Sequence, residues 1–169
     1  MPELRFDQQV VVVTDVNSGL GDACASFLAS RGSSVVINEL PRGTNELGSF
    51  SARSPPKTVD ILVDKIRHIG GNAIATCESL ANGGKIVDKA ISEYGRIDIL
   101  INNASFDGGE NDGWDSMLDV NVKGAYKVCC YGPVPALITN RTFAVVCASC
   151  VATLQEAKIR ASHQYSIAS

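Results

Sequence analysis

Strand patterns and helix patterns alternate along this chain, and that alternation restricts its fold more than any other feature. The β-branched and apolar runs typical of strands buried on both faces lie at residues 10–14, 34–38, 73–77, 97–102 and 143–148. Helical spacing of apolar residues lies between them, at residues 19–31, 57–68, 82–94 and 112–130. Because β-α-β connections are right-handed, we expect a Rossmann-type doubly wound parallel sheet of about five strands in the order 3-2-1-4-5.

The length of 169 residues suits one domain, so we expect residues 1–169 to form a single dinucleotide-binding domain. A net charge of -3 without a run of basic residues argues against a nucleic-acid partner. No apolar run approaches the ~20 residues of a membrane-spanning helix. The charged N-terminus lacks the apolar core of a secretory signal, so cytoplasm is the default location.

Without a secretory signal, we expect the six cysteines to be reduced thiols, mostly buried as small apolar residues. Cys77, at the end of its strand, is expected to pack in the core. Cys147 and Cys150 form a C-x-x-C pair, which a metal or redox site would use only if further thiols converged on it. We favour core packing and an oxidisable pair, predict no metal site, and leave the role of these two cysteines open.

The segment after the first strand has the pattern of a phosphate-binding loop. Thr14 ends the strand, and Gly19 and Gly21 open the next helix, whose N-terminus attracts anions. Glu39 follows Gly19 by 20 residues, where a carboxylate binds the ribose hydroxyls of NAD and repels the extra phosphate of NADP. The pattern predicts a nucleotide site; the alternative is a glycine pair that serves only helix packing. The residues expected to line the loop are Thr14, Asn17, Gly19, Leu20 and Gly21.

These motifs resemble those of the short-chain dehydrogenase/reductase family. Residues 14–21 resemble its Thr-Gly-x-x-x-Gly-x-Gly loop, and residues 102–105 resemble its Asn-Asn-Ala-Gly segment. Asn121, Ser149 and Tyr165 stand where the family keeps its Asn, Ser and Tyr, so the resemblance covers essentially the whole chain.

Within the family, the chain is most similar to the hydroxyacyl-CoA dehydrogenase domains of peroxisomal multifunctional β-oxidation enzymes of type 2. The shared features are the Met-Pro-x-Leu-x-Phe opening and the segments at residues 95–98 and 164–166. The resemblance implies NAD-dependent oxidation of a hydroxyacyl-CoA or similar secondary alcohol. It also implies a peroxisomal location, although the chain ends in Ser-Ile-Ala-Ser and not in the Ser-Lys-Leu signal.

The resemblance also implies a role for each site residue. Tyr165 would be the general acid and base, Ser149 would hold the substrate oxygen, and Asn121 would support a proton-relay water. Asn103 and Ala104 would border the cofactor.

Several positions depart from the family pattern. Asp15 replaces the first glycine of the loop and puts a carboxylate beside an anionic pyrophosphate; Asp tolerates left-handed backbone angles, so the turn itself can survive. Ser169 replaces the lysine four residues after Tyr165, whose charge assists proton exchange. Ser105 replaces a glycine, and a longer Ser149–Tyr165 spacing implies a short insertion. We therefore expect weakened or lost NAD binding.

The resemblance implies a truncated domain, because the family fold continues beyond this chain's last residue. The strand at residues 143–148 would then be an apolar outer strand, which favours a homo-oligomer or a protein partner that covers it.

Three functions stay open at this level. The first is an NAD-dependent dehydrogenase with a small-molecule substrate and an impaired site. The second is a repurposed domain, either a non-redox enzyme that uses the old pocket or a non-catalytic interaction subunit. The third is a truncated product without a function of its own.

Overall fold

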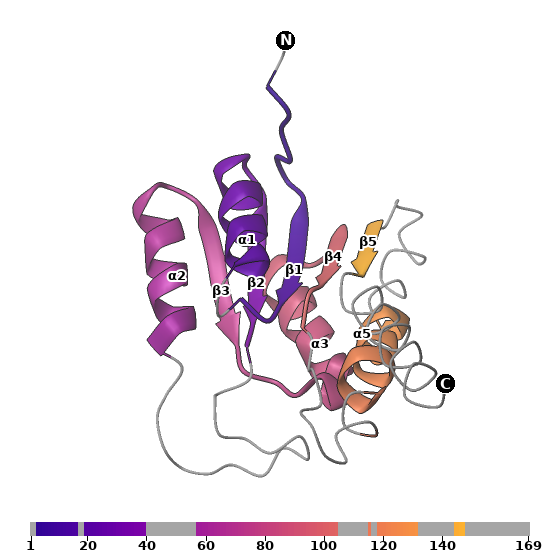
Figure 1. The fold of residues 1–169 in the computed structure, drawn as a ribbon. Coiled ribbons are helices and arrows are strands. Elements are labelled where there is room, and N and C mark those ends of the chain that lie inside the picture. The colour runs from indigo at the N-terminus through magenta and orange to yellow at the C-terminus, as the bar shows by residue number, and fades with distance from the viewer. Residues whose placement is uncertain are drawn as a thin grey trace, which may run out of the picture.

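A five-stranded parallel sheet forms the centre of the protein. A computed structural model describes residues 3–16, 19–39, 57–104, 115, 118–131 and 144–147. Its strands are β1 (Val10–Thr14), β2 (Ser34–Asn38), β3 (Asn72–Thr76), β4 (Ile99–Asn102) and β5 (Ala144–Cys147). They pair in the order β3-β2-β1-β4-β5, all parallel (Figure 1). The predicted strand order is therefore confirmed.

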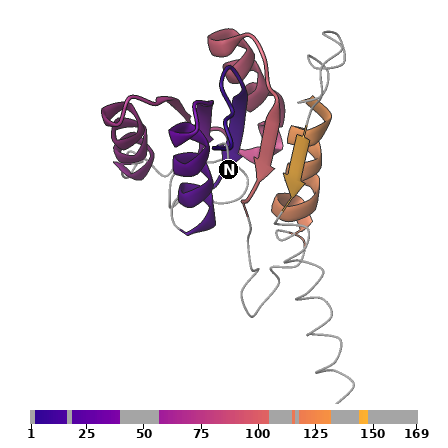
Figure 2. The ribbon, with the colours of Figure 1, turned by 90° about the horizontal axis from the view of Figure 1, so that it is seen from above.

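Helices cover both faces of this sheet. They are α1 (Leu20–Ser30), α2 (Lys57–His68), α3 (Gly83–Tyr94) and α5 (Ala125–Tyr131), with a 3-10 turn η1 (Leu80–Asn82) and a π-helical turn η2 (Asp119–Gly124). Figure 2 shows α1 and α2 on the opposite side of the sheet from α5. This is the doubly wound arrangement that the alternating pattern predicted.

The alternation of side chains along β1 explains the two layers. Val11 and Val13 pack with α1 and α2, whereas Val10 and Val12 pack with α3 and α5. All five residues of β1 are buried, which requires a helical layer on each face. Helix α2 has its predicted bounds and buries the predicted apolar face: Val59, Leu62, Val63 and Ile66.

The buried face of α1 differs from the predicted one. Helical spacing puts the apolar residues Leu20, Cys24, Phe27 and Leu28 on one side of this segment and so predicts that this side is buried. In the structure, however, Leu20 and Phe27 are 59% and 46% exposed. Cys24 is only partly buried. The buried residues of the helix are Gly21, Ala25, Leu28 and Ala29. Small side chains on this face let α1 approach the sheet closely, which large ones would prevent.

The four cysteines that the structure describes are free thiols, as predicted, but none of them is fully buried. Strand β3 ends at Thr76, so Cys77 lies beyond the strand and is exposed. Cys130 is also exposed, while Cys24 and Cys129 are partly buried. Cys77 lies outside the core because it begins the loop at the carboxyl edge of the sheet. Cys147 lies in β5, of which only the backbone is described, and Cys150 lies outside the described residues.

Some predictions concern parts of the chain that the structure does not describe. Among them is the short insertion implied between Ser149 and Tyr165. Within the described ranges, no helix is long and apolar enough to cross a membrane.

A buried carboxylate ties β1 to the start of β4. The Val10 N–H donates to Asp98 Oδ2 at 2.8 Å, and the Asp98 N–H donates to the Val10 carbonyl at 2.9 Å. The other oxygen of Asp98 accepts from the Arg96 guanidinium. Because Asp98 is 6% exposed, loss of its carboxylate would leave Val10 N–H and Arg96 without this partner.

We expect Asp98→Ala to lower the free energy of unfolding by about 2 kcal/mol, the cost of an unsatisfied buried group and a lost charged hydrogen bond. Urea unfolding followed by circular dichroism measures the change. Asp7→Ala is the matched control, because Arg5 and Asp7 form a similar pair that is more than half exposed on both sides. It should cost much less; equal losses would refute the buried role of Asp98.

Candidate functional site

The loop after β1 holds Asp15 in a left-handed backbone conformation, with φ of 54°. Its N–H donates to the Asn38 carbonyl at 2.8 Å. Its own carbonyl accepts from Asn103 Nδ2 at 2.7 Å. The expectation that aspartate tolerates this turn is therefore confirmed. The last residue of β2 and the residue after β4 fix the Asp15 backbone from both sides.

The two glycines of the loop serve different purposes. Gly19, with φ of 62°, is the N-cap of α1, and a Cβ added there would meet nothing within 4 Å. A Cβ on Gly21 would lie 2.3 Å from the Asp15 carbonyl oxygen and 2.9 Å from Asn103 Nδ2. Gly21 therefore allows the helix to touch the loop, while Gly19 leaves space at the helix start.

The first turn of α1 has the features of an anion site. Gly19 provides no side-chain cap for the N–H groups of this turn, and Leu20 beside it is exposed. The N-terminus of an α-helix carries partial positive charge from such N–H groups. A phosphate group could accept from them across the open space at Gly19.

The Thr14 hydroxyl joins this loop to the segment that follows β4. This fully buried hydroxyl accepts from the N–H of Asn103 at 3.0 Å and from the N–H of Ala104 at 3.1 Å. The same hydroxyl lies 3.5 Å from the Ile101 carbonyl, to which it can donate. The predicted cofactor residues Thr14, Gly21, Asn103 and Ala104 thus form one hydrogen-bonded and closely packed unit.

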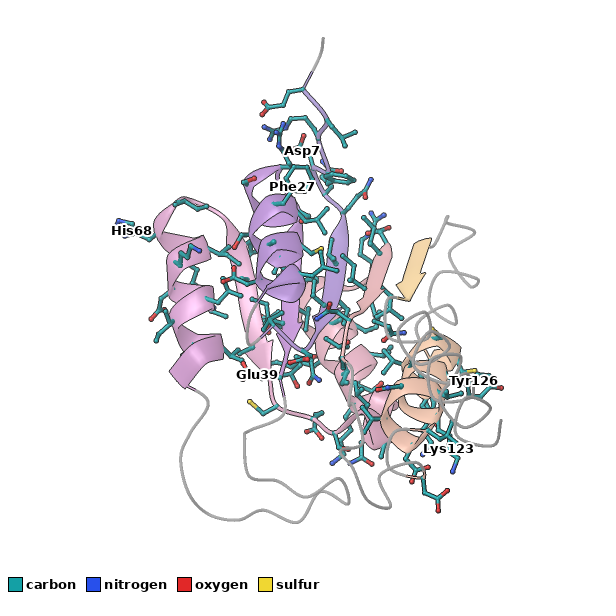
Figure 3. All side chains as sticks on the ribbon, viewed as in Figure 1. Asp7, Phe27, Glu39, His68, Lys123 and Tyr126 are labelled. Atoms are coloured by element: carbon teal, nitrogen blue, oxygen red, sulfur yellow. The ribbon has the colours of Figure 1, made fainter. Side chains whose placement is uncertain are left out.

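Glu39 lies at the carboxyl edge of the sheet, directly after β2 (Figure 3). It is 2% exposed, and its N–H donates to the Thr76 carbonyl at 3.1 Å. Burial, and then the carboxylates of Asp60, Glu39 and Glu78, raise the pKa of the nearby Cys77 thiol. The Cys77 thiol therefore stays protonated at neutral pH. The same carboxylates give its surroundings a negative potential, which disfavours a further anion there.

Asn121 lies buried in the π-helical turn η2, which the sequence pattern did not predict. A Cβ on Gly124 would lie 2.8 Å from Leu80 Cβ and 3.2 Å from the Asp119 carbonyl oxygen, so η2 packs tightly on η1. Turns of this kind are rare and are often found at functional sites. The spacing of apolar residues in a regular helix does not indicate a π-helical turn, because the extra residue of such a turn depends on packing against a neighbouring segment, here η1.

Asn102 connects the end of β4 to α5, the helix that follows η2. Its side-chain amide donates to the Ala125 carbonyl at 3.2 Å and lies 3.1 Å from Cys129 Sγ. Ala125 comes one helical turn after Asn121, so this contact places the Asn121 segment at the carboxyl edge of the sheet.

Sequence reasoning missed Asn38 and Asn102 as site residues. Both are buried polar residues at the last position of an apolar strand, and that position was the available signal. Other predicted residues lie outside the described ranges: Asn17, Ser105, Ser149, Tyr165 and Ser169. Of the predicted catalytic set, the structure places Asn121 alone. In the described part of the chain, no cluster of three or more His, Cys, Asp or Glu residues could hold a metal ion.

We expect Thr14→Val to lower the free energy of unfolding by about 1–2 kcal/mol, because two backbone N–H groups lose their acceptor while the side-chain shape is kept. Chemical denaturation measures the loss. Thr14→Ser keeps the hydroxyl and should retain most of the stability. If the serine and valine variants unfold alike, the hydroxyl does not join β1 to the segment after β4.

Solved structures share this fold. Carveol dehydrogenase from Mycobacterium avium in complex with NAD superposes with a TM-score of 0.71 at 20% identity, over 83% of this chain and 54% of that one. A metagenomic short-chain oxidoreductase in complex with NADP gives a TM-score of 0.66 at 23% identity, over 82% of this chain and 61% of that one.

Curated relatives share more of the sequence. Over 74% of this chain, identity is 46% to the peroxisomal hydratase-dehydrogenase-epimerase of Neurospora crassa. It is 40%, again over 74% of the chain, to the peroxisomal multifunctional enzyme type 2 of Drosophila melanogaster. The matched parts span 14% and 21% of those longer proteins. The family model for short chain dehydrogenase matches residues 9–166, and the chain therefore belongs to the short-chain dehydrogenase family.

Proposed function

We propose that this protein binds NAD at the carboxyl edge of its sheet and that its reaction is the oxidation of a hydroxyacyl-CoA or a similar secondary alcohol. The observation that supports this most is the loop between β1 and α1. The Asp15 N–H donates to the Asn38 carbonyl and the Asp15 carbonyl accepts from the Asn103 side-chain amide, which together hold the turn. Gly21 packs against this turn without room for a Cβ. The names of the relatives, which include a dehydrogenase, support the reaction type.

The described residues fit a nicotinamide dinucleotide. The first turn of α1, open at Gly19, would hold the pyrophosphate. Glu39 would bind the hydroxyls of the adenosine ribose, and its charge would disfavour the extra phosphate of NADP. Asn103 and Ala104 would border the cofactor beside Thr14. When bound, the nicotinamide supplies hydride transfer, and the protein supplies orientation and proton transfer.

The proposed catalytic roles follow the family pattern. Tyr165 would exchange a proton with the substrate hydroxyl, Ser149 would donate a hydrogen bond to the substrate oxygen, and Asn121 would hold a water that relays the proton. Ser169 has no charge with which to assist Tyr165, so we propose a slower proton transfer than an enzyme with lysine there would have.

The proposal extends to partners and location. Strand β5 is the outer strand of the described sheet, and we propose that a second copy or another protein covers that apolar strand. The relatives are peroxisomal enzymes, which supports a peroxisomal location over a cytoplasmic one.

Asp15 is the residue on which the proposed activity depends most. A carboxylate near an anionic pyrophosphate costs roughly 1–4 kcal/mol, which corresponds to about one to three decades in dissociation constant. We therefore expect Asp15→Gly and Asp15→Asn to bind NADH about 10- to 1,000-fold more tightly than the native chain. A fluorescence titration with NADH measures the change.

Asp88→Asn is the matched control, because it removes an exposed carboxylate of helix α3, outside both the loop and the first turn of α1. It should change the NADH affinity far less. If neither Asp15 variant improves binding, charge repulsion does not limit the affinity. If none of the chains binds NADH, the redox proposal is wrong, and a repurposed domain becomes the better account.

Glu39 should set the choice between the two cofactors. Glu39→Ser removes a charged acceptor for the ribose and a repulsive charge for a phosphate. We expect the preference for NADH over NADPH to shrink by about 10- to 100-fold, as for a lost hydrogen bond to a charged group. Asp60→Asn removes another carboxylate near Cys77 and should leave the preference largely unchanged. Parallel titrations with both cofactors test this, and an unaltered preference in Glu39→Ser would exclude the assigned role.

A further inference from the structure

Asn38 connects three of the segments that leave the carboxyl edge of the sheet. Its backbone carbonyl accepts from the Asp15 N–H at 2.8 Å. Its side-chain Nδ2 donates to the Glu78 carbonyl at 3.1 Å, and its Oδ1 accepts from the Glu78 N–H at 3.0 Å. Glu39 follows it directly in the chain. One residue thus joins the phosphate loop, the Glu39 segment and the segment after β3.

The position of Asn38 makes these contacts strong. It is 2% exposed and is the last residue of β2, in register with Thr14 of β1 and Thr76 of β3. The planar amide offers one donor and one acceptor side by side, which matches the carbonyl and N–H of a single residue across the strand end. Aspartate would keep the acceptor but direct a second negative oxygen at the Glu78 carbonyl. Alanine would leave both Glu78 groups without this partner.

We propose that Asn38 is a positioning residue for nucleotide binding, which holds the Glu78 segment and the Asp15 loop on either side of Glu39 before the ligand arrives. This inference rests on the proposed NAD site. Segments that are already ordered cost less free energy to bind a ligand, so loss of the Asn38 amide should weaken the affinity. A purely structural role would lower the stability of the protein but leave the affinity of its folded form unchanged.

The chain offers a matched control at the other end of the same strands. Asn72 Nδ2 donates to Ser34 Oγ at 3.2 Å, which also joins β2 to β3, but at the amino ends of these strands. Asn72 is exposed and far from the proposed site along both strands. Its loss removes a side-chain bond between the same two strands without touching the carboxyl edge.

The experiment compares Asn38→Ala, Asn38→Asp and Asn72→Ala with the native chain in NADH titrations, with urea unfolding to confirm that each variant is folded. We expect both Asn38 variants to bind NADH about tenfold more weakly. Asn72→Ala should bind like the native chain. Hydrogen exchange at the Glu78 amide provides a readout without ligand. We expect it to quicken in Asn38→Ala, which removes the acceptor of this N–H, and to stay unchanged in Asn72→Ala; Asn38→Asp keeps an acceptor and should quicken it less.

The outcomes separate this inference from the proposed function. If the native chain binds NADH and the folded Asn38 variants bind it equally well, the positioning role is wrong and the NAD site stands. If the native chain and Asp15→Gly both fail to bind NADH, the proposed function fails, and the positioning role fails with it. If Asn38→Asp does not fold, Asn38→Ala, which introduces no buried charge, decides the question.

Discussion

The buried hydroxyl of Thr14 is the contact on which the site depends. Its oxygen accepts hydrogen bonds from the backbone N–H groups of Asn103 and Ala104, at the point where β1 and β4 both end. These two bonds fix how the segment after β4 leaves the sheet. That segment in turn places the Asn103 amide on the Asp15 carbonyl, which completes the turn of the phosphate loop.

The same principle recurs along the whole carboxyl edge. Each of the strands β2, β1 and β4 has a run of apolar residues followed by a buried polar last residue: Asn38, Thr14 and Asn102. A strand end must satisfy backbone groups that no longer have a ladder partner, and a short polar side chain does this at close range. These bonds order the described segments at this edge of the sheet, where ligands bind in folds of this kind.

The backbone of Asp15 keeps the shape of the loop, whereas its side chain changes the charge of the loop. Its left-handed backbone angle is one that aspartate adopts at small cost, so the turn keeps the form that a glycine would have. The carboxylate nevertheless adds negative charge to an edge that already carries Glu39, Asp60 and Glu78 around Cys77. In the proposed dinucleotide site, this charge would weaken the attraction of an anionic ligand.

The sequence by itself determined the layers, the strand order and the position of the phosphate loop. Periodicity reports burial directly: β1 is apolar at four of its five positions, and α2 repeats its apolar residues on one face. That the turn survives with Asp15 was also predictable, because aspartate tolerates left-handed backbone angles better than most residues do.

Only the tertiary structure decided which face of α1 is buried, where Cys77 lies, that a π-helical turn carries Asn121, and what Asn38 and Asn102 bind. The buried face of α1 follows from how closely the helix can approach the sheet, and the η2 turn follows from its contact with Leu80. Asn38 acts on Glu78, 40 residues later in the chain. Such contacts join segments that are distant in sequence. Local sequence patterns do not predict which distant backbone group a buried side-chain amide will bind.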